Sequence, residues 1–209
     1  MDSIPQLTVV TGLPRCGTSL LMKVLHQSGM VPFVDEFYSY ESKLTNTLNE
    51  DNRWVVELPK EGFQVIKALY PQVLDLPYTD PRYNVEVNLQ YNMLWMVRNA
   101  REMAKSQRLF MIQMGNKVHR GWLGPRTKLI RKANKSMVDF FRRAANVNFE
   151  VISFDGLLTN PQPEVEKIAR LTGVVPNLSC VVHRSPKNSG QLIGTLEIPA
   201  NPNSLPLIT

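Results

Sequence analysis

Short apolar runs rich in β-branched residues alternate along the chain with longer segments in which apolar residues recur at helical spacing. The first pattern is typical of buried strands and the second of amphipathic helices. The runs that we expect to form strands cover residues 7–11, 63–69, 93–97 and 149–154. The segments that we expect to form helices cover residues 18–28, 99–113, 126–145 and 162–172. This alternation predicts an α/β fold with a parallel sheet covered by helices on both faces.

The length and composition are those of one ordinary folded domain. The chain has 209 residues, of which 43% are hydrophobic, too high a share for a disordered protein. No apolar run approaches the ~20 residues that a membrane helix needs. We therefore expect a single domain over residues 1–209 that makes no contact with a membrane. Residues 190–209, interrupted by three prolines, are expected to form an extended C-terminal tail.

The cysteines and the N-terminus suggest where the protein resides. Cys16 and Cys180 are too few to build a disulfide framework. The first residues lack the basic stretch, apolar stretch and cleavage site of a secretory signal. A reducing, cytoplasmic location is therefore expected.

Positive charge is concentrated in one part of the chain. The formal net charge is +6, and residues 98–143 hold 13 Lys and Arg against 2 acidic residues, so the remainder is net acidic. Such segregation predicts a face that attracts anions. The sign of the charge does not distinguish nucleic acid from a phosphorylated ligand or an acidic substrate.

The segment from Thr11 to Ser19 carries the most specific chemical signal. Its letters TGLPRCGTS have the spacing of a phosphate-binding loop, Gly-x4-Gly followed by Thr-Ser, between an expected strand and an expected helix. Glycines let backbone amides approach an anion, and the positive end of the helix adds attraction. Nucleoside triphosphatases carry a lysine after the second glycine. Here Thr18 replaces it and the loop cation is Arg15, which disfavours ATP hydrolysis.

A phosphatase-type thiolate loop is a second interpretation of the same segment, because Cys16 precedes a helix N-terminus, which lowers the pKa of a thiol. Such a loop needs an arginine six residues further on, and that position is Met22. We therefore expect Cys16 to occupy a position that requires a small side chain.

The loop resembles that of the sulfotransferases that use 3′-phosphoadenosine 5′-phosphosulfate, in the form with arginine that protein-tyrosine and many bacterial members carry. A second segment, VRNAREMAKS over residues 97–106, is similar to the 3′-phosphate motif of that family, with Arg98 at the strand end and Ser106 eight residues later. The resemblance implies a three-layer P-loop NTPase-like fold with a central parallel sheet. It also implies in-line transfer of a sulfuryl group to a hydroxyl or amine acceptor, without a metal, leaving adenosine 3′,5′-bisphosphate.

The resemblance assigns roles to individual residues. Arg15 is expected to stabilise charge on the bridging oxygen, and Arg98 with Ser106 to bind the 3′-phosphate. A late basic loop with Arg184 and Lys187 is expected to close over the same phosphate. The residues expected to hold the 5′-phosphosulfate are Leu13, Pro14, Arg15, Cys16, Gly17, Thr18 and Ser19.

Two further segments extend the resemblance. FQVIKALYP over residues 63–71 looks like the strand that brings a lysine to the reaction centre, here Lys67. A lysine at a strand end that extends its ammonium to solvent is the alternative interpretation. VISFDGLL over residues 151–158 looks like the C-terminal Tyr-Glu-Asp-Leu segment of the family, with Phe154 in the place of the tyrosine.

The general base is assigned by the resemblance alone. Cytosolic small-molecule sulfotransferases carry a histidine two residues after the strand lysine, where this chain has Leu69. In the protein-tyrosine branch the base is a glutamate 21 residues beyond the loop arginine, and Glu36 stands at that distance from Arg15. Glu36 is therefore the expected base, and an exposed acidic residue in a loop is the alternative.

Two other functions are alternatives to the sulfotransferase. A P-loop kinase of a nucleotide or small metabolite would need Mg²⁺, and Thr18 in the lysine position weighs against it.

A nucleic-acid-binding module would use the basic segment 98–143 and would lose affinity steeply with salt. However, that segment lacks interleaved aromatic residues for base stacking. Its cations lie opposite apolar positions of an expected helix, namely Leu129, Ala133, Met137, Phe140, Phe141 and Ala144. The sequence leaves the sulfuryl acceptor open among a small molecule, a glycan and a peptide, and it does not indicate an oligomeric state.

Overall fold

A four-stranded parallel sheet lies at the centre of the protein. The computed structural model describes residues 6–33, 46–48, 54–56, 64–76 and 90–181. Within them the sheet has the strand order β4-β1-β5-β6. Its strands are β1 Gln6–Gly12, β4 Val65–Leu69, β5 Gln90–Val97 and β6 Val147–Ser153. A separate antiparallel pair consists of β2 Asn46–Leu48 and β3 Trp54–Val56.

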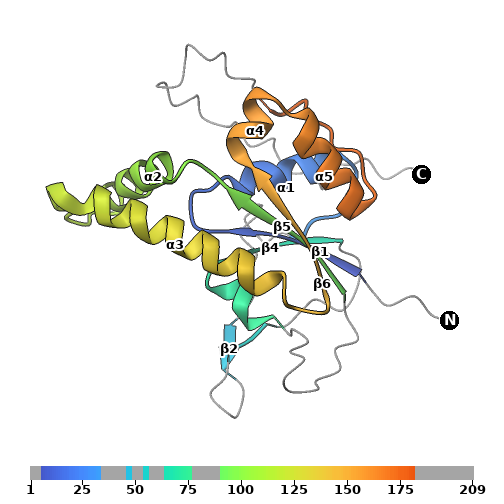
Figure 1. Ribbon diagram of the computed structural model, residues 1–209, viewed down its shortest axis with the longest axis horizontal. Helices are drawn as coiled ribbons and strands as arrows, with labels where there is room; N and C mark the ends of the chain where they lie inside the picture. Colours follow the sequence, from blue (N-terminus) through green and yellow to red (C-terminus); the bar gives the residue numbers. More distant parts are fainter. Residues whose placement is uncertain (1–5, 34–45, 49–53, 57–63, 77–89, 182–209) are drawn as a thin grey trace, which may run out of the picture.

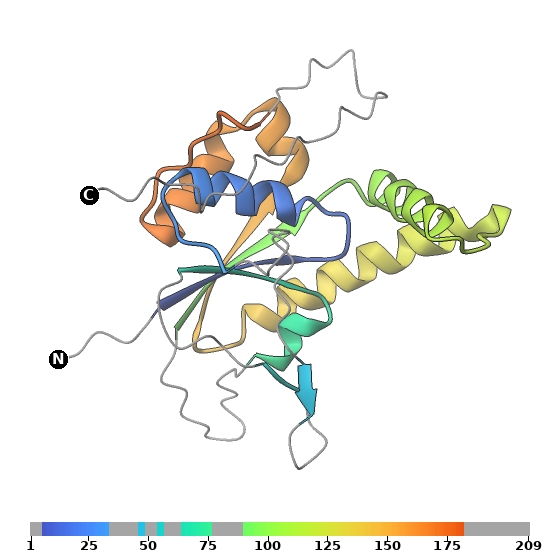
Figure 2. The same ribbon diagram turned by 180° about the vertical axis from the view of Figure 1, so that it is seen from behind.

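Helices cover both faces of the sheet, which gives three layers (Figure 1; Figure 2). One face carries α1 Thr18–Gln27, α4 Phe154–Thr159 and α5 Gln162–Thr172. The other face carries α3 Leu123–Phe141, and α2 Ala100–Gln113 packs along α3 beyond the sheet. Two short 3₁₀ helices cover Gln72–Asp75 and Arg120–Trp122. The predicted three-layer α/β fold with a central parallel sheet is therefore confirmed.

The expected tail, residues 190–209, lies outside the described residues. In the part of the chain that is described, no helix combines the length and apolarity that crossing a membrane requires.

Aromatic side chains pack α3 against the sheet. Trp95 of β5 and Phe141 of α3 are fully buried, with ring centroids 5.6 Å apart. Phe149 of β6 stacks on Phe141 at 5.7 Å. The indole nitrogen of Trp95 donates a hydrogen bond of 3.2 Å to Oδ1 of Asn134. Because the buried indole N–H has a partner, this cluster adds apolar burial without an unsatisfied donor.

The strand β5 begins three residues before the apolar run 93–97 that predicted it, because a polar residue is accommodated in the sheet. Asn92 is buried, and its amide nitrogen donates to Oε1 of Gln6 at 3.2 Å. Its amide oxygen accepts from Nδ2 of Asn148 at 2.9 Å. Side-chain amides thus connect β1, β5 and β6 across the sheet. A prediction based on apolar runs ends the strand at such polar residues.

The predicted apolar face of α3 is partly wrong. Leu129 is 56% exposed and Phe140 is 39% exposed. Met137 and Phe141 of the predicted face do pack against the core, and they share that side of the helix with Ile130, which was not predicted. These three residues are spaced by one or two helical turns. Leu129 and Phe140 each precede one of these residues in the sequence. Consecutive residues of a helix point in different directions, so both side chains point away from the packed side.

The boundaries of two other segments also differ from prediction. The helix expected over residues 126–145 begins at Leu123 and ends at Phe141, and Pro125 lies in its first turn, where proline is tolerated. The short helix α4 was not predicted. It begins after Ser153, whose hydroxyl accepts a hydrogen bond of 2.9 Å from the Gly156 amide.

Replacement of Phe141 by alanine tests the packing of α3. We expect Phe141→Ala to lower the free energy of unfolding by about 3–5 kcal/mol, because it leaves a cavity next to Trp95 and Phe149. Urea unfolding followed by circular dichroism measures the loss. Phe140→Ala, at the partly exposed neighbouring position, is the matched control and should cost less than half as much. Equal losses would contradict this arrangement of α3.

Candidate functional site

The strand ends that carry the predicted site residues lie at one edge of the sheet. Gly12, at the end of β1, is in register with Leu69 of β4 on one side and with Met96 of β5 on the other. The loop after β1, Lys67 in β4 and Arg98 just after β5 are therefore neighbours. In parallel α/β sheets this carboxyl edge is where ligands bind.

The loop between β1 and α1 has the conformation of an anion cradle. Gly17 has a φ of 110°, and a Cβ added there would lie 2.3 Å from Cδ2 of Phe154, so a larger residue does not fit. Arg15 has a φ of 73°, which is uncommon outside glycine. No acceptor within the described residues is bonded to the backbone amides of Arg15, Gly17 or Ser19. These amides, at the positive end of α1, are available to bind an anion.

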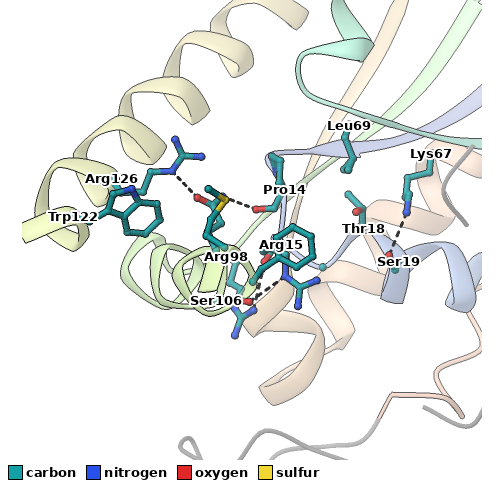
Figure 3. Close-up of a pocket in the computed structure, with 14 residues that line it drawn as sticks. Pro14, Arg15, Thr18, Ser19, Lys67, Leu69, Arg98, Ser106, Trp122 and Arg126 are labelled. Carbon is teal, nitrogen blue, oxygen red and sulfur yellow. Dashed lines mark hydrogen bonds between the residues drawn. The ribbon is translucent and has the colours of Figure 1, made fainter. Parts of the chain in front are cut away.

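The two predicted phosphate-binding segments contact one another (Figure 3). Nε of Arg15 in the loop donates a hydrogen bond of 3.2 Å to Oγ of Ser106 in α2. Nη1 of Arg98 donates to the carbonyl oxygen of Arg15 at 3.5 Å, a long hydrogen bond. The Arg98 guanidinium also lies 4.7 Å from the centre of the Phe154 ring, within the range of a cation–π contact. Residues far apart in the sequence thus form one cationic group.

Phe154 replaces the tyrosine that the resemblance leads one to expect, and it contacts both parts of the site. Its ring fills the space beside Gly17 and supports the Arg98 guanidinium. Because phenylalanine has no hydroxyl, its contribution to the site is packing.

Lys67 is held inside the protein next to the loop. Its residue is 3% exposed, so the side chain does not extend its ammonium to bulk solvent. Nζ lies 3.4 Å from Oγ of Ser19, to which it donates a hydrogen bond. A buried ammonium is costly unless it faces polar or charged groups. Its position therefore favours a role in binding an anion at the loop.

One cavity of about 630 Å³ joins these groups. Among the predicted site residues, those that line it are Pro14, Arg15, Gly17, Thr18, Ser19, Lys67, Arg98 and Ser106. Leu13 and Cys16 are buried and lie outside this lining. Glu36, Arg184 and Lys187 lie outside the described residues. Among the described residues that line the cavity there is no carboxylate and no imidazole.

Sequence reasoning missed several lining residues, namely Leu69, Gln107, Phe110, Met111, Trp122 and Arg126. Nε2 of Gln107 donates to the carbonyl oxygen of Pro14 at 2.7 Å, and Oε1 of Gln107 accepts from Nε of Arg126 at 2.6 Å. Gln107 shares a buried face of α2 with Met103, and a polar residue at an apolar helix position is the signal that could have found it. Arg126 offered no such signal, because it lies in a run of surface cations.

Cys16 is the buried small residue that the sequence predicted. It is 1% exposed, and its Sγ lies 2.5 Å from the position that a Cβ on Gly12 would take. Burial raises the pKa of the Cys16 thiol to about 12, although the backbone amide of Thr18 opposes this shift. A thiol with that pKa is protonated at neutral pH and is a poor nucleophile.

Comparisons with known proteins give a distant likeness in structure. No protein-family model and no curated protein matches the chain. Among solved structures, the chain is similar to the sulfotransferase from Alicyclobacillus acidocaldarius, at 18% sequence identity and a TM-score of 0.49, over 89% of this chain and 88% of that one.

Alkylation of the two cysteines tests the burial of the loop. At pH 8 a thiol with a pKa of about 12 has roughly one thiolate in 10⁴ molecules. The Cys180 residue is more exposed, and burial raises the pKa of its thiol as well. In the native protein we expect iodoacetamide to modify Cys16 at least about tenfold more slowly than Cys180. In urea, where both thiols are exposed, the two rates should be equal. Mass spectrometry of the peptides measures the rates, and faster modification of native Cys16 would contradict the loop geometry.

Proposed function

We propose that the protein is a sulfotransferase that moves a sulfuryl group from 3′-phosphoadenosine 5′-phosphosulfate to a hydroxyl or amine acceptor. The observation that carries this proposal is the contact between the loop and the second phosphate-binding segment, through Arg15 and Ser106. A ligand with phosphates at both its 5′ and 3′ positions can engage both elements. ATP can engage the loop alone, and Thr18 stands where its terminal phosphates require a lysine.

The loop residues would hold the 5′-phosphosulfate. The free amides at the start of α1, together with the hydroxyl groups of Thr18 and Ser19, supply hydrogen-bond donors for phosphate oxygens. Arg15 adds a planar guanidinium, which suits a forked contact to such oxygens. Arg98 and Ser106 would hold the 3′-phosphate, and the ring of Phe154 supports Arg98 in that position. Arg184 and Lys187 are proposed to close over the same phosphate.

The chemistry of the transfer requires that charge be neutralised and a proton removed. The oxygen or nitrogen of the acceptor bonds to the sulfur of the donor. At the same time the bond from sulfur to the bridging oxygen breaks, and its electron pair stays on the phosphate. Arg15 and Lys67, which both line the cavity, are proposed to stabilise the growing charge on that phosphate. Glu36 is the proposed base for the acceptor proton. Leu69, in the position of the family histidine, cannot take it.

Nucleotide binding measured by titration calorimetry tests the proposal. We expect adenosine 3′,5′-bisphosphate to bind at least about tenfold more tightly than adenosine 5′-monophosphate, which lacks the 3′-phosphate. Arg98→Ala should weaken binding of the bisphosphate by roughly 10- to 100-fold, because a charge-assisted contact to the 3′-phosphate is lost. It should leave the affinity for the monophosphate nearly unchanged. Arg101→Ala, an exposed arginine that does not line the cavity, is the matched control and should bind like the unmodified protein.

Two results would overturn the function. If ATP with Mg²⁺ binds more tightly than the bisphosphate, the kinase interpretation is preferred. If Arg98→Ala and Arg101→Ala bind the bisphosphate equally well, the second phosphate site does not exist. Transfer of radiolabelled sulfuryl to a panel of hydroxyl and amine acceptors then measures the activity itself.

A further inference from the structure

The cavity continues beyond the phosphate-binding residues into a second half. There its walls are Phe110 and Met111 of α2, Trp122 of the 3₁₀ helix and Arg126 of α3. Figure 3 shows Trp122 and Arg126 at the opposite side of the view from Lys67, Thr18 and Ser19. We call these four residues the outer wall. Phe110 also supports the Arg15 guanidinium, which lies 5.6 Å from the centre of its ring. The other three residues take no part in the proposed binding of the donor phosphates.

The outer wall presents apolar and aromatic surface to the cavity. Phe110 is 45% exposed and Met111 is 38% exposed, and both line the cavity, in a stretch of α2 whose other large apolar side chains are exposed as well. Trp122 is half-buried beside them. Such a surface favours a ligand with a flat apolar body, since aromatic rings stack in offset or edge-to-face geometry and methionine sulfur packs against ring edges.

Arg126 is held in place at this apolar surface. Its Nε donates to Oε1 of Gln107 at 2.6 Å, and its guanidinium lies 5.7 Å from the centre of the Trp122 ring. Gln107 is itself fixed by its hydrogen bond to the carbonyl oxygen of Pro14. In the described ranges no carboxylate pairs with Arg126, and its two Nη groups donate to no protein acceptor. A positioned guanidinium with free donors is suited to bind a carboxylate in a forked contact.

We propose that the outer wall binds the acceptor and that the acceptor is an aromatic hydroxy acid, an inference that rests on the sulfotransferase function. The ring would lie against Phe110 and Trp122, with its carboxylate on Arg126 and its hydroxyl directed towards Arg15 of the loop, whose guanidinium lies beside the Phe110 ring. The hydroxyl oxygen bonds to sulfur as the bond from sulfur to the bridging oxygen breaks, and the hydroxyl proton passes to the base. The adenine of the donor is a less suitable occupant, because it carries no negative charge to pair with Arg126.

Paired acceptors that differ in charge test the proposal. 3-(4-Hydroxyphenyl)propanoate and its neutral amide have the same phenol and nearly the same shape. With the unmodified protein we expect the acid to have a KM at least about tenfold below that of the amide. Arg126→Gln should remove this preference by raising the KM of the acid while leaving that of the amide within about twofold, and Arg126→Lys should give an intermediate value. Arg131→Gln, an exposed arginine of the same helix outside the cavity, is the control.

Calorimetry separates the possible failures. Arg126→Gln should bind adenosine 3′,5′-bisphosphate as the unmodified protein does, and should bind the acid more weakly in the presence of that nucleotide. Equal use of acid and amide by the unmodified protein overturns the acceptor class. A loss of bisphosphate affinity in folded Arg126→Gln overturns the placement, because Arg126 would then belong to the donor site. If the unmodified protein does not bind the bisphosphate at all, the proposed function fails as well, and this inference falls with it.

Discussion

The parallel pairing of β1 with both of its neighbours is the constraint on which the rest of the site depends. Gly12 is in register with Leu69 and with Met96, so the three strands end at the same level. The loop after β1 and the helix after β5 leave the sheet from that shared edge. Burial on both faces holds the register, since a slip by one residue would turn every buried side chain to the opposite face.

The loop is shaped by contacts from later parts of the chain. The Phe154 ring leaves no room for a side chain at Gly17, and the same ring supports the Arg98 guanidinium. Gln107 of α2 binds the carbonyl oxygen of Pro14 from the opposite direction. The loop after β1 is therefore held between α2 and α4, which limits its freedom before any ligand arrives. Such preorganisation lowers the cost of binding.

The concentration of positive charge in residues 98–143 serves more than one purpose in the folded protein. Lys128, Arg131 and Lys135 are exposed on α3, which agrees with the surface of a solvated helix. Arg98 and Arg126 from the same segment line the cavity instead. A count of charges along the sequence cannot separate these groups, because residues one or two positions apart on a helix, such as Arg126 and Lys128, face in different directions.

The sequence by itself determined most of the helices and strands and the loop after β1. Apolar periodicity and the Pro161 and Gly173 signals located α5 at Gln162–Thr172, and the glycine spacing identified the loop after β1. These features depend on residues within a few positions of each other. Tertiary structure decided what lies around the cavity: Arg15 meets Ser106 across 91 positions, and Gln107 connects Pro14 to Arg126. Contacts of that kind leave no local pattern, because they arise where separate elements pack together.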